Sequence, residues 1–347
     1  MVAEFIVSGS SQAAVQSKKK SNVVAFPLRQ TALSEPSLQW LANYSQKRNY
    51  VDSYALPGYF LITGRKGLSL VNQHDGYFPV CCHPNLNERL LIFPPVGSAT
   101  AISEYLHTLE LWPSNGVQLA RIPLEEQESI VSSLKKEWDV VPMQESILDW
   151  GKYPVRSLNV KAMALREGKQ FKNHRRKYNY VKKRIEGVDI TESWDSKKDN
   201  KFEKFIYQWA QKKHSHNGEF SLDDYVSPYL KIISMHANSS VRSVCLLFEN
   251  SVGEILGTVV VEISNGIAAT YMNIAIDEIS HFPAYILMKT CEFLYEENLA
   301  EVLCLGGSEE NGLDKFKSDL QSCSDRTDSR LSYHLKSFLV KPPLAKP

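Results

Sequence analysis

The chain of 347 residues lacks the short signatures of several large enzyme classes. It has neither a G-x-x-x-x-G-K-[ST] loop nor a G-x-G-x-x-G fingerprint, so nucleotide hydrolysis and dinucleotide redox chemistry have no site in this sequence. A G-x-S-x-G nucleophile elbow is also absent. No run approaches the roughly 18 uninterrupted apolar residues of a membrane-spanning helix. The start of the chain has no basic flank followed by an apolar block, so we expect neither a secreted nor an integral membrane protein.

The net charge is also small, and cysteines are few. There are 40 lysines and arginines against 39 acidic residues, a formal charge of +1, so any polyanion must bind a local patch. The six cysteines form no C-x-x-C pair and most lie in apolar runs, which is typical of reduced, structural cysteines in a cytoplasmic protein. His214 and His216 have no third ligand at a suitable spacing, so we predict no metal site.

Length and composition favour two domains, because 43% hydrophobic residues are enough for two sizeable cores. Polar, basic residues without periodicity predict a disordered tail over 1–30. We place one domain at 31–148, a second at 149–340, and a short tail at 341–347.

The first domain is predicted to be α+β. Apolar runs separated by turn formers indicate an antiparallel meander, and helical spacing appears after Ser98 and again from residue 124. The expected strands are YFLIT (59–63), LSLVN (68–72), YFPVCC (77–82), LLIF (90–93) and GVQLARIP (116–123).

The second domain is predicted to begin with a helical stretch over 156–187 that is broken at Gly168 and closed by Gly187. Further helices are expected at 199–214, 283–298 and 312–320, and strands at 240–249, 254–264, 266–276 and 300–307. Antiparallel strands, a crossing helix, a returning strand and a last helix follow the order of elements in GNAT-type acyltransferases.

Three blocks of sequence resemble a known family. IFPPVG (92–97), GKQFKNHRRKYNYVKKR (168–184) and LGGSEENGLDKFK (305–317) are similar, in this order, to segments of the tandem-GNAT domain at the C-terminal end of phosphatidylglycerol lysyltransferases. That family is related to the Fem peptidoglycan aminoacyltransferases. The resemblance implies two fused GNAT-like (acyl-CoA N-acyltransferase) domains, each with a mixed, mostly antiparallel sheet flanked by helices. It also implies an acyltransferase, although the family's membrane-embedded half is absent, which leaves the lipid acceptor open.

The second block has eight basic side chains and no acid between Lys169 and Arg184. At helical spacing, Phe171, Tyr178, Val181 and Ile185 form a buried stripe, and the cations form a separate face. Such a face can neutralise several phosphates, although a solvated helix without a ligand is the alternative. The candidate residues for binding the donor's phosphates are Lys169, Lys172, Arg175, Arg176 and Lys183.

The third block predicts the reaction centre. Gly306, Gly307 and Ser308 directly follow an apolar strand, so the backbone can bend sharply and expose its amides to a ligand. Lys317 can stabilise an oxyanion or hold a donor phosphate, and the Fem resemblance implies a catalytic role for it. The alternative is an ordinary turn followed by a solvated lysine. The other catalytic candidates are Tyr271, Asn273 and His281, of which His281 is more typical of a structural role.

The prediction of the acyl donor rests on a feature that the sequence lacks. GNAT enzymes hold the CoA pyrophosphate on a glycine-rich turn, whereas residues 275–289 contain no glycine and present bulky Ile279, Phe282 and Tyr285. We therefore expect no bound cofactor and aminoacyl-tRNA as co-substrate, with an amine acceptor of a small molecule, peptide or lipid headgroup. An acyl-CoA-dependent N-acyltransferase and a non-catalytic RNA- or protein-binding scaffold stay open. The acceptor and the oligomeric state are not determined.

Overall fold

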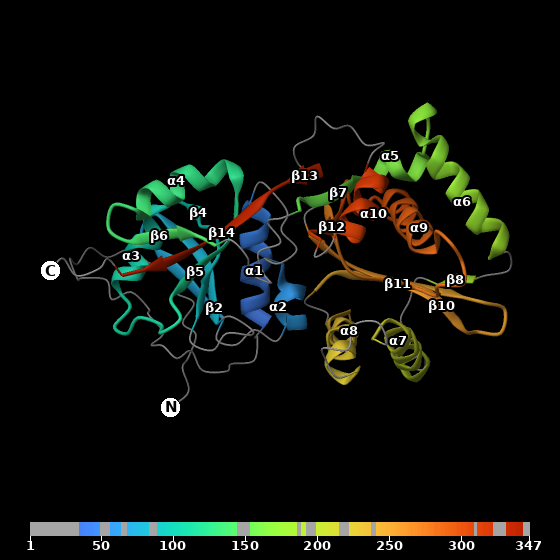
Figure 1. The fold of residues 1–347 in the computed structure, drawn as a ribbon, viewed down its shortest axis with the longest axis horizontal. Helices are drawn as coiled ribbons and strands as arrows, with labels where there is room; N and C mark the ends of the chain where they lie inside the picture. The colour runs from blue at the N-terminus through green and yellow to red at the C-terminus, as the bar shows by residue number, and fades with distance from the viewer. Residues whose placement is uncertain are drawn as a thin grey trace.

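A computed structural model shows two α+β halves, each built on its own sheet (Figure 1). The expected tail at 1–30, most of the one at 341–347, and His216, Gly187 and Cys323 lie outside the described residues. The structure describes residues 35–48, 56–63, 68–82, 89–143, 153–185, 189–191, 199–214, 222–236, 241–264, 266–308, 311–321 and 331–342.

The N-terminal half contains a mixed sheet in the order β1-β2-β3-β5-β14-β6, with β4 paired to β2. Helices α3 and α4 pack on one face of this sheet, and α1 and α2 pack on the other. The strands are β1 (Ser69–Gln73), β2 (Gly76–Cys82), β3 (Leu90–Ile92), β4 (Val96–Gly97), β5 (Val117–Pro123) and β6 (Asp139–Pro142). The helices are α1 (Glu35–Lys47), α2 (Pro57–Thr63), α3 (Thr100–His107) and α4 (Leu124–Leu134).

One expected strand of this half is wrong. The segment YFLIT belongs to helix α2, which begins with Pro57. Proline suits the first position of a helix because the amide hydrogen it lacks would have no partner inside the helix. A short apolar run is compatible with either structure, and here packing decides: Phe60 and Ile62 are buried in two different cores on either side of the helix.

The C-terminal half contains a second mixed sheet in the order β13-β7-β12-β11-β10-β9-β8. Helices α5, α6, α9 and α10 lie on one side of it, and α7 and α8 lie on the other (Figure 1). The strands are β7 (Val155–Asn159), β8 (Asp189–Thr191), β9 (Ser243–Glu249), β10 (Ile255–Ser264), β11 (Ile267–Ala275), β12 (Val302–Gly306) and β13 (Ser332–Tyr333). The helices are α5 (Val160–Leu165), α6 (Lys172–Arg184), α7 (Asp199–His214), α8 (Leu222–His236), α9 (Phe282–Glu296) and α10 (Asn311–Gln321), with a short 3₁₀ turn at Lys169–Phe171.

The start of the expected helical stretch is also corrected. Residues 155–159 form strand β7, because Val155, Ser157 and Leu158 are buried in the sheet and pair with β12 and β13. The helix begins only where the side chain of Asn159 accepts a hydrogen bond from the amide of Ala162, as an N-cap. The break at Gly168 is confirmed, since this glycine has a φ of +85° between α5 and α6.

The last described strand, β14 (Leu335–Lys341), connects the two halves. It lies between β5 and β6 and pairs with both, so it completes the N-terminal sheet (Figure 1). These residues were expected in the second domain, up to residue 340. Pairing on both sides satisfies the backbone groups of the strand and removes two open sheet edges, which explains its place.

A small shared core lies where the halves meet. Residues from both contribute to it: Leu56, Val155, Ala269, Cys304 and Leu335. Helix α2 of the N-terminal half also packs against α8 of the C-terminal half. The described helices include none that is long and apolar enough to cross a membrane.

The position of β14 gives a stability prediction. Val340 is fully buried in the N-terminal core, so Val340→Ala should lower the free energy of unfolding by about 2 kcal/mol through lost burial and a cavity. Urea unfolding followed by the fluorescence of Trp112 and Trp138, which stack in this half, measures it. The matched control is Lys336→Ala on the same strand, which is exposed and should change stability by less than about 0.5 kcal/mol. Equal stability of the two variants would contradict the pairing of β14.

Candidate functional site

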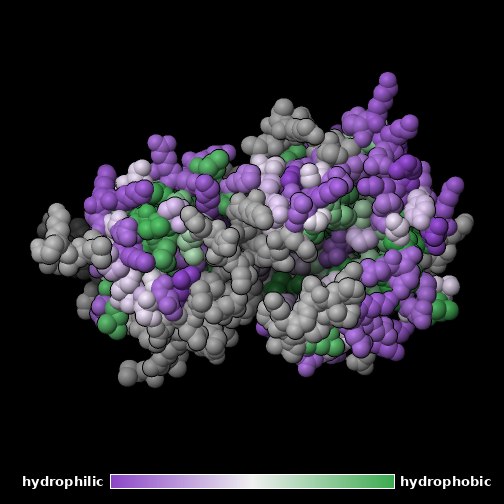
Figure 2. Space-filling model, in the orientation of Figure 1, coloured by the Kyte–Doolittle hydropathy of each residue, from purple (hydrophilic) through white to green (hydrophobic). Residues whose placement is uncertain are grey.

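The C-terminal sheet opens between two neighbouring parallel strands. Strands β11 and β12 pair only over Ile267–Ala269 and Val302–Cys304. In the described structure, β11 continues for six residues beyond this pairing without a partner on β12, while its other edge stays paired to β10. Backbone groups of β11 therefore face the opening instead of a strand. Figure 2 shows the surface hollowed in this half, between the layer with α9 and α10 and the layer with α7 and α8.

A β-bulge starts at the opening. Val260 pairs with Met272 and Val261 pairs with Thr270, so Tyr271 is the extra residue of β11. Bulges redirect side chains and increase the local twist of a strand. Tyr271 points toward Cys304 and the shared core, and its phenol donates a hydrogen bond to Oε2 of Glu262 at 2.6 Å. The predicted residue Tyr271 thus lies where the two strands separate.

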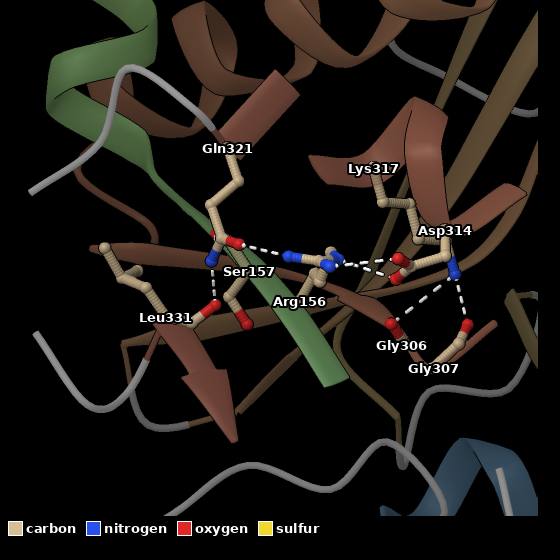
Figure 3. Close-up of polar contacts among 8 residues, drawn as sticks. All are labelled: Arg156, Ser157, Gly306, Gly307, Asp314, Lys317, Gln321 and Leu331. Atoms are coloured by element: carbon tan, nitrogen blue, oxygen red, sulfur yellow. Dashed lines mark hydrogen bonds and ion pairs between the residues drawn. The ribbon is translucent and has the colours of Figure 1, made fainter. Parts of the chain in front are cut away.

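The glycine pair and Lys317 are in direct contact (Figure 3). Gly306 ends β12 with a φ of +71°, a left-handed conformation that glycine adopts without strain. Lys317 lies on α10, is 8% exposed, and donates from Nζ to the carbonyls of Gly306, at 3.4 Å, and Gly307. The structure therefore does not show the solvated lysine of the alternative interpretation. The ammonium is held beside the bend at the end of β12.

Helix α10 is fixed to the sheet by a bidentate ion pair. Arg156 of β7 donates from Nε to Asp314 Oδ1 at 2.7 Å and from Nη2 to Oδ2 at 3.0 Å, while Nη1 donates to Gln321 at 3.0 Å (Figure 3). The Arg156 and Asp314 side chains are only 15% and 14% exposed, so solvent screens this pair little. Gln321 also donates to the carbonyls of Ser157 and Leu331. Lys317 lies between these two anchors on one rigid helix.

Three buried polar oxygens near the opening have no hydrogen-bond partner within the described residues: Thr270 Oγ1, Asn273 Oδ1 and Ser308 Oγ. Thr270 and Asn273 lie on the part of β11 that has no partner on β12, and Ser308 follows the glycine pair. The amide nitrogen of Asn273 donates to the carbonyl of Pro283 at 3.3 Å, which fixes the orientation of its oxygen. Buried polar atoms without a protein partner are places where water or a ligand bonds. Two predicted residues, Asn273 and Ser308, therefore offer oxygens at the site.

A buried carboxylate that the sequence analysis missed is also present. Glu262 of β10 is 2% exposed, and besides Tyr271 it accepts a hydrogen bond from the amide of Gly58 on α2 at 3.0 Å. Burial raises the pKa of Glu262 to about 7, and the two hydrogen bonds oppose that shift. An acid inside the apolar run ILGTVVVEIS (255–264) was the available signal.

The basic helix α6 is anchored through a buried charge network. Tyr178 donates to Glu292 of α9 at 3.2 Å, and Arg166, whose guanidinium lies 4.1 Å from the Tyr178 ring centroid, pairs with the same carboxylate. Lys289 is a third partner of Glu292. Burial, followed by the nearby charge of Glu292, raises the pKa of Tyr178 to about 12, so this phenol stays protonated as a donor. Phe171, Val181 and Ile185 are buried as predicted, with Tyr178 partly buried.

The candidate cations divide into two groups. Lys169, Lys172, Arg176 and Lys183 are exposed, and Figure 2 shows hydrophilic side chains gathered where α5 and α6 lie. Arg175 instead donates to the carbonyls of Arg166 and Gly168, so it closes the end of α5. Its guanidinium therefore has a structural task that the sequence did not reveal.

His281 connects α6 with the opening. It precedes α9 with a φ of +67°, and its ring lies 6.1 Å from that of Tyr180 on α6. Partial burial, then Lys177 and Arg176, lowers its pKa, so His281 is neutral at pH 7. Because β11 and β12 are parallel, their carboxyl ends share one edge of the sheet, which brings His281 and the glycine pair to the same edge.

The bulky side chains expected to obstruct a CoA-binding turn do not lie as predicted. Phe282 and Tyr285 are 0% and 4% exposed and pack against Phe248 in the core. Their side chains therefore do not cover the turn before α9. The described residues contain no group of three His, Cys, Asp or Glu side chains that could hold a metal ion.

No protein-family model and no curated protein sequence matches the chain. Solved structures do share its fold. A conserved protein of unknown function from Bacteroides thetaiotaomicron VPI-5482 has a TM-score of 0.67 and 10% identity, over 91% of this chain and 100% of that one. FemX has a TM-score of 0.57 and 11% identity, over 89% and 96% of the two chains. L-PGS from Bacillus licheniformis has a TM-score of 0.54 and 11% identity, over 87% and 91%.

Identities this low establish the fold and leave the activity open. The resemblance found in the sequence is confirmed at that level. The chain has the α+β fold of two fused GNAT-like domains that FemX and L-PGS share.

Proposed function

We propose that the chain is an acyltransferase that moves an aminoacyl group from aminoacyl-tRNA to an amine of a small molecule, peptide or lipid headgroup. The observation that carries this proposal is the opening between β11 and β12, which has the Lys317 ammonium at its wall and unpartnered buried oxygens beside it. The similar fold of FemX and L-PGS supports the same reaction class.

The chemistry requires little beyond placement and charge. An aminoacyl ester is already activated, so a neutral, well-positioned amine attacks its carbonyl carbon. Asn273 Oδ1 and Thr270 Oγ1 are acceptors that suit an amine's N–H groups. The ammonium of Lys317 suits the negative charge that develops on the carbonyl oxygen of the tetrahedral intermediate.

The donor follows from the exposed face of α6. Lys172, Arg176 and Lys183 are exposed on a helix without acidic residues, and this helix reaches His281 at the edge where β11 and β12 end. Phosphates of a tRNA acceptor stem can bind these side chains while the 3′ end enters the opening.

Removing three of these cations should weaken tRNA binding and its salt dependence. In the variant Lys172→Gln, Arg176→Gln, Lys183→Gln, the slope of log affinity against log salt should become shallower by about 2, because each lost phosphate contact contributes about 0.7. Filter binding with charged tRNA over a salt series measures the slope. A matched control removes Lys135, Lys136 and Lys341, which are exposed on the N-terminal half. An equal loss in the control would mean that binding is diffuse and that α6 is not the tRNA surface.

Loss of the Lys317 ammonium should slow turnover strongly with little effect on donor binding. Lys317→Met keeps the buried stem, and we expect kcat for aminoacyl transfer to fall by about 10²–10³-fold. Lys315→Met, an exposed position on the same helix, is the control and should keep full activity. Thermal unfolding of both variants shows whether the fold is intact.

Either of two results would contradict this proposal and favour another function. If folded Lys317→Met binds and works like wild type, the chain is a binding scaffold. If acyl-CoA shifts the melting temperature and serves as donor while charged tRNA does neither, the chain is a CoA-dependent N-acyltransferase.

A further inference from the structure

One flank of α6 faces the turn before α9. Arg176, Tyr180 and Arg184 are spaced four residues apart, so their side chains lie one above the other on the same side of the helix. Arg176 and the neighbouring Lys177 lie close enough to interact electrostatically with His281. The ring of Tyr180 lies 6.1 Å from that of His281. This flank therefore borders the edge of the sheet at which β11 and β12 end.

Three planar groups meet on this flank. The guanidinium of Arg184 lies over the ring of Tyr180, 4.5 Å from its centroid, and the ring of His281 approaches the same tyrosine at an interplanar angle of 72°. All three residues are exposed, Tyr180 by 38%. Aromatic rings and guanidinium planes are the surfaces on which bases of single-stranded RNA stack. The flank thus combines positive charge with a stacking platform.

The tyrosine two residues earlier shows the contrast. Tyr178 donates to Glu292 and has Arg166 over its ring, so it anchors α6 to α9. Among the described residues, the side chain of Tyr180 has no such hydrogen bond, and His281 makes no side-chain hydrogen bond that caps α9. His281 nevertheless has a left-handed backbone, which is uncommon outside glycine and is found at functional sites. Tyr180 and His281 are therefore available to a ligand without loss of an anchor.

We propose that Tyr180 and Arg184 form a stacking site for an unpaired base at the 3′ end of the RNA donor. This inference rests on the proposed function for the identity of the donor. The 3′ end of a tRNA is single-stranded, and it carries the aminoacyl group. A base held beside His281 leads that end toward the opening, while the other cations of α6 bind phosphates of the paired stem.

The composition of the flank distinguishes this ligand from other polyanions. No acidic residue lies between Lys169 and Arg184, so the helix suits phosphates over its whole length. Phosphates alone require only cations, whereas the ring of Tyr180 adds a π face that contributes when a base is unpaired. Arginine is both charged and planar, so Arg184 serves both purposes. The ligand that fits is single-stranded RNA, more than a duplex or an acidic peptide.

The test is a cycle of two proteins and two RNAs. Equilibrium binding of uncharged tRNA is compared with binding of the same tRNA trimmed of its unpaired 3′ nucleotides, for wild type and Tyr180→Ala. The variant should bind intact tRNA about 10-fold more weakly and trimmed tRNA as wild type does, because the trimmed end offers no base to stack. The slope of log affinity against log salt should not change, since no charge is lost.

Three further variants separate stacking from charge. Tyr180→Phe keeps the ring and should bind as wild type does. Arg184→Lys keeps the charge without the plane, and should lose about threefold in affinity for intact tRNA only. Tyr295→Ala removes a tyrosine that is similarly exposed, by 40%, at the opposite end of α9, and should leave both affinities unchanged. Thermal unfolding shows whether each variant is folded.

The outcomes are distinct. Equal affinity of wild type and Tyr180→Ala for intact tRNA, or an equal loss with trimmed tRNA, would overturn the stacking site and leave the proposed function in place. A polyglutamate peptide that binds as tightly as RNA and depends equally on Tyr180 would assign the flank to an acidic protein and overturn the site. A wild-type protein that binds neither RNA would refute both proposals. The expected cycle in a protein that transfers nothing from charged tRNA would support the stacking site and refute the acyl transfer.

Discussion

The site depends on a pairing that stops after three residues. Beyond Ala269 and Cys304, β11 and β12 no longer bond to each other, although β11 remains paired to β10 on its other side. The backbone groups on the free edge of β11 alternate between donors and acceptors, and in a closed sheet a neighbouring strand would satisfy them. An occupant that offers both kinds of group, as the α-amine and the ester carbonyl of the proposed aminoacyl donor do, satisfies these backbone groups.

An opening of this kind persists only if its walls are rigid. On one side, the bidentate pair of Arg156 with Asp314 fixes α10, and with it Lys317, to strand β7. On the other, α9 approaches the sheet so closely that a Cβ at Gly257 would lie 2.7 Å from the side chain of Ile286. Neither wall can move without breaking a buried ion pair or repacking the core. The lysine and the glycine pair are therefore held in place before a substrate binds.

Local patterns in the sequence predicted much of this structure, but they did not reveal the contacts between distant segments. The strands β9 to β12 and the helices α9 and α10 follow hydrophobic periodicity, and the glycine pair and Lys317 belong to one continuous segment. Glu262 was missed because the amide that holds it belongs to Gly58, 204 residues away. Arg175 looked like its exposed neighbours, because only the folded chain places two carbonyls within its reach. The place of strand β14 in the N-terminal sheet was missed for the same reason, because no local pattern determines which sheet a strand joins.

The two halves complete each other, and this ties the acidity of the site to their contact. The C-terminal strand β14 fills the N-terminal sheet, while α2 of the N-terminal half covers Glu262 and donates the Gly58 amide to it. The raised pKa of Glu262 comes first from burial, and α2 contributes to that burial from the opposite half. Separation of the halves would let water reach the carboxylate and return its pKa toward the ordinary value. Contact between the two domains therefore sets the proton affinity of a buried carboxylate that belongs to one of them.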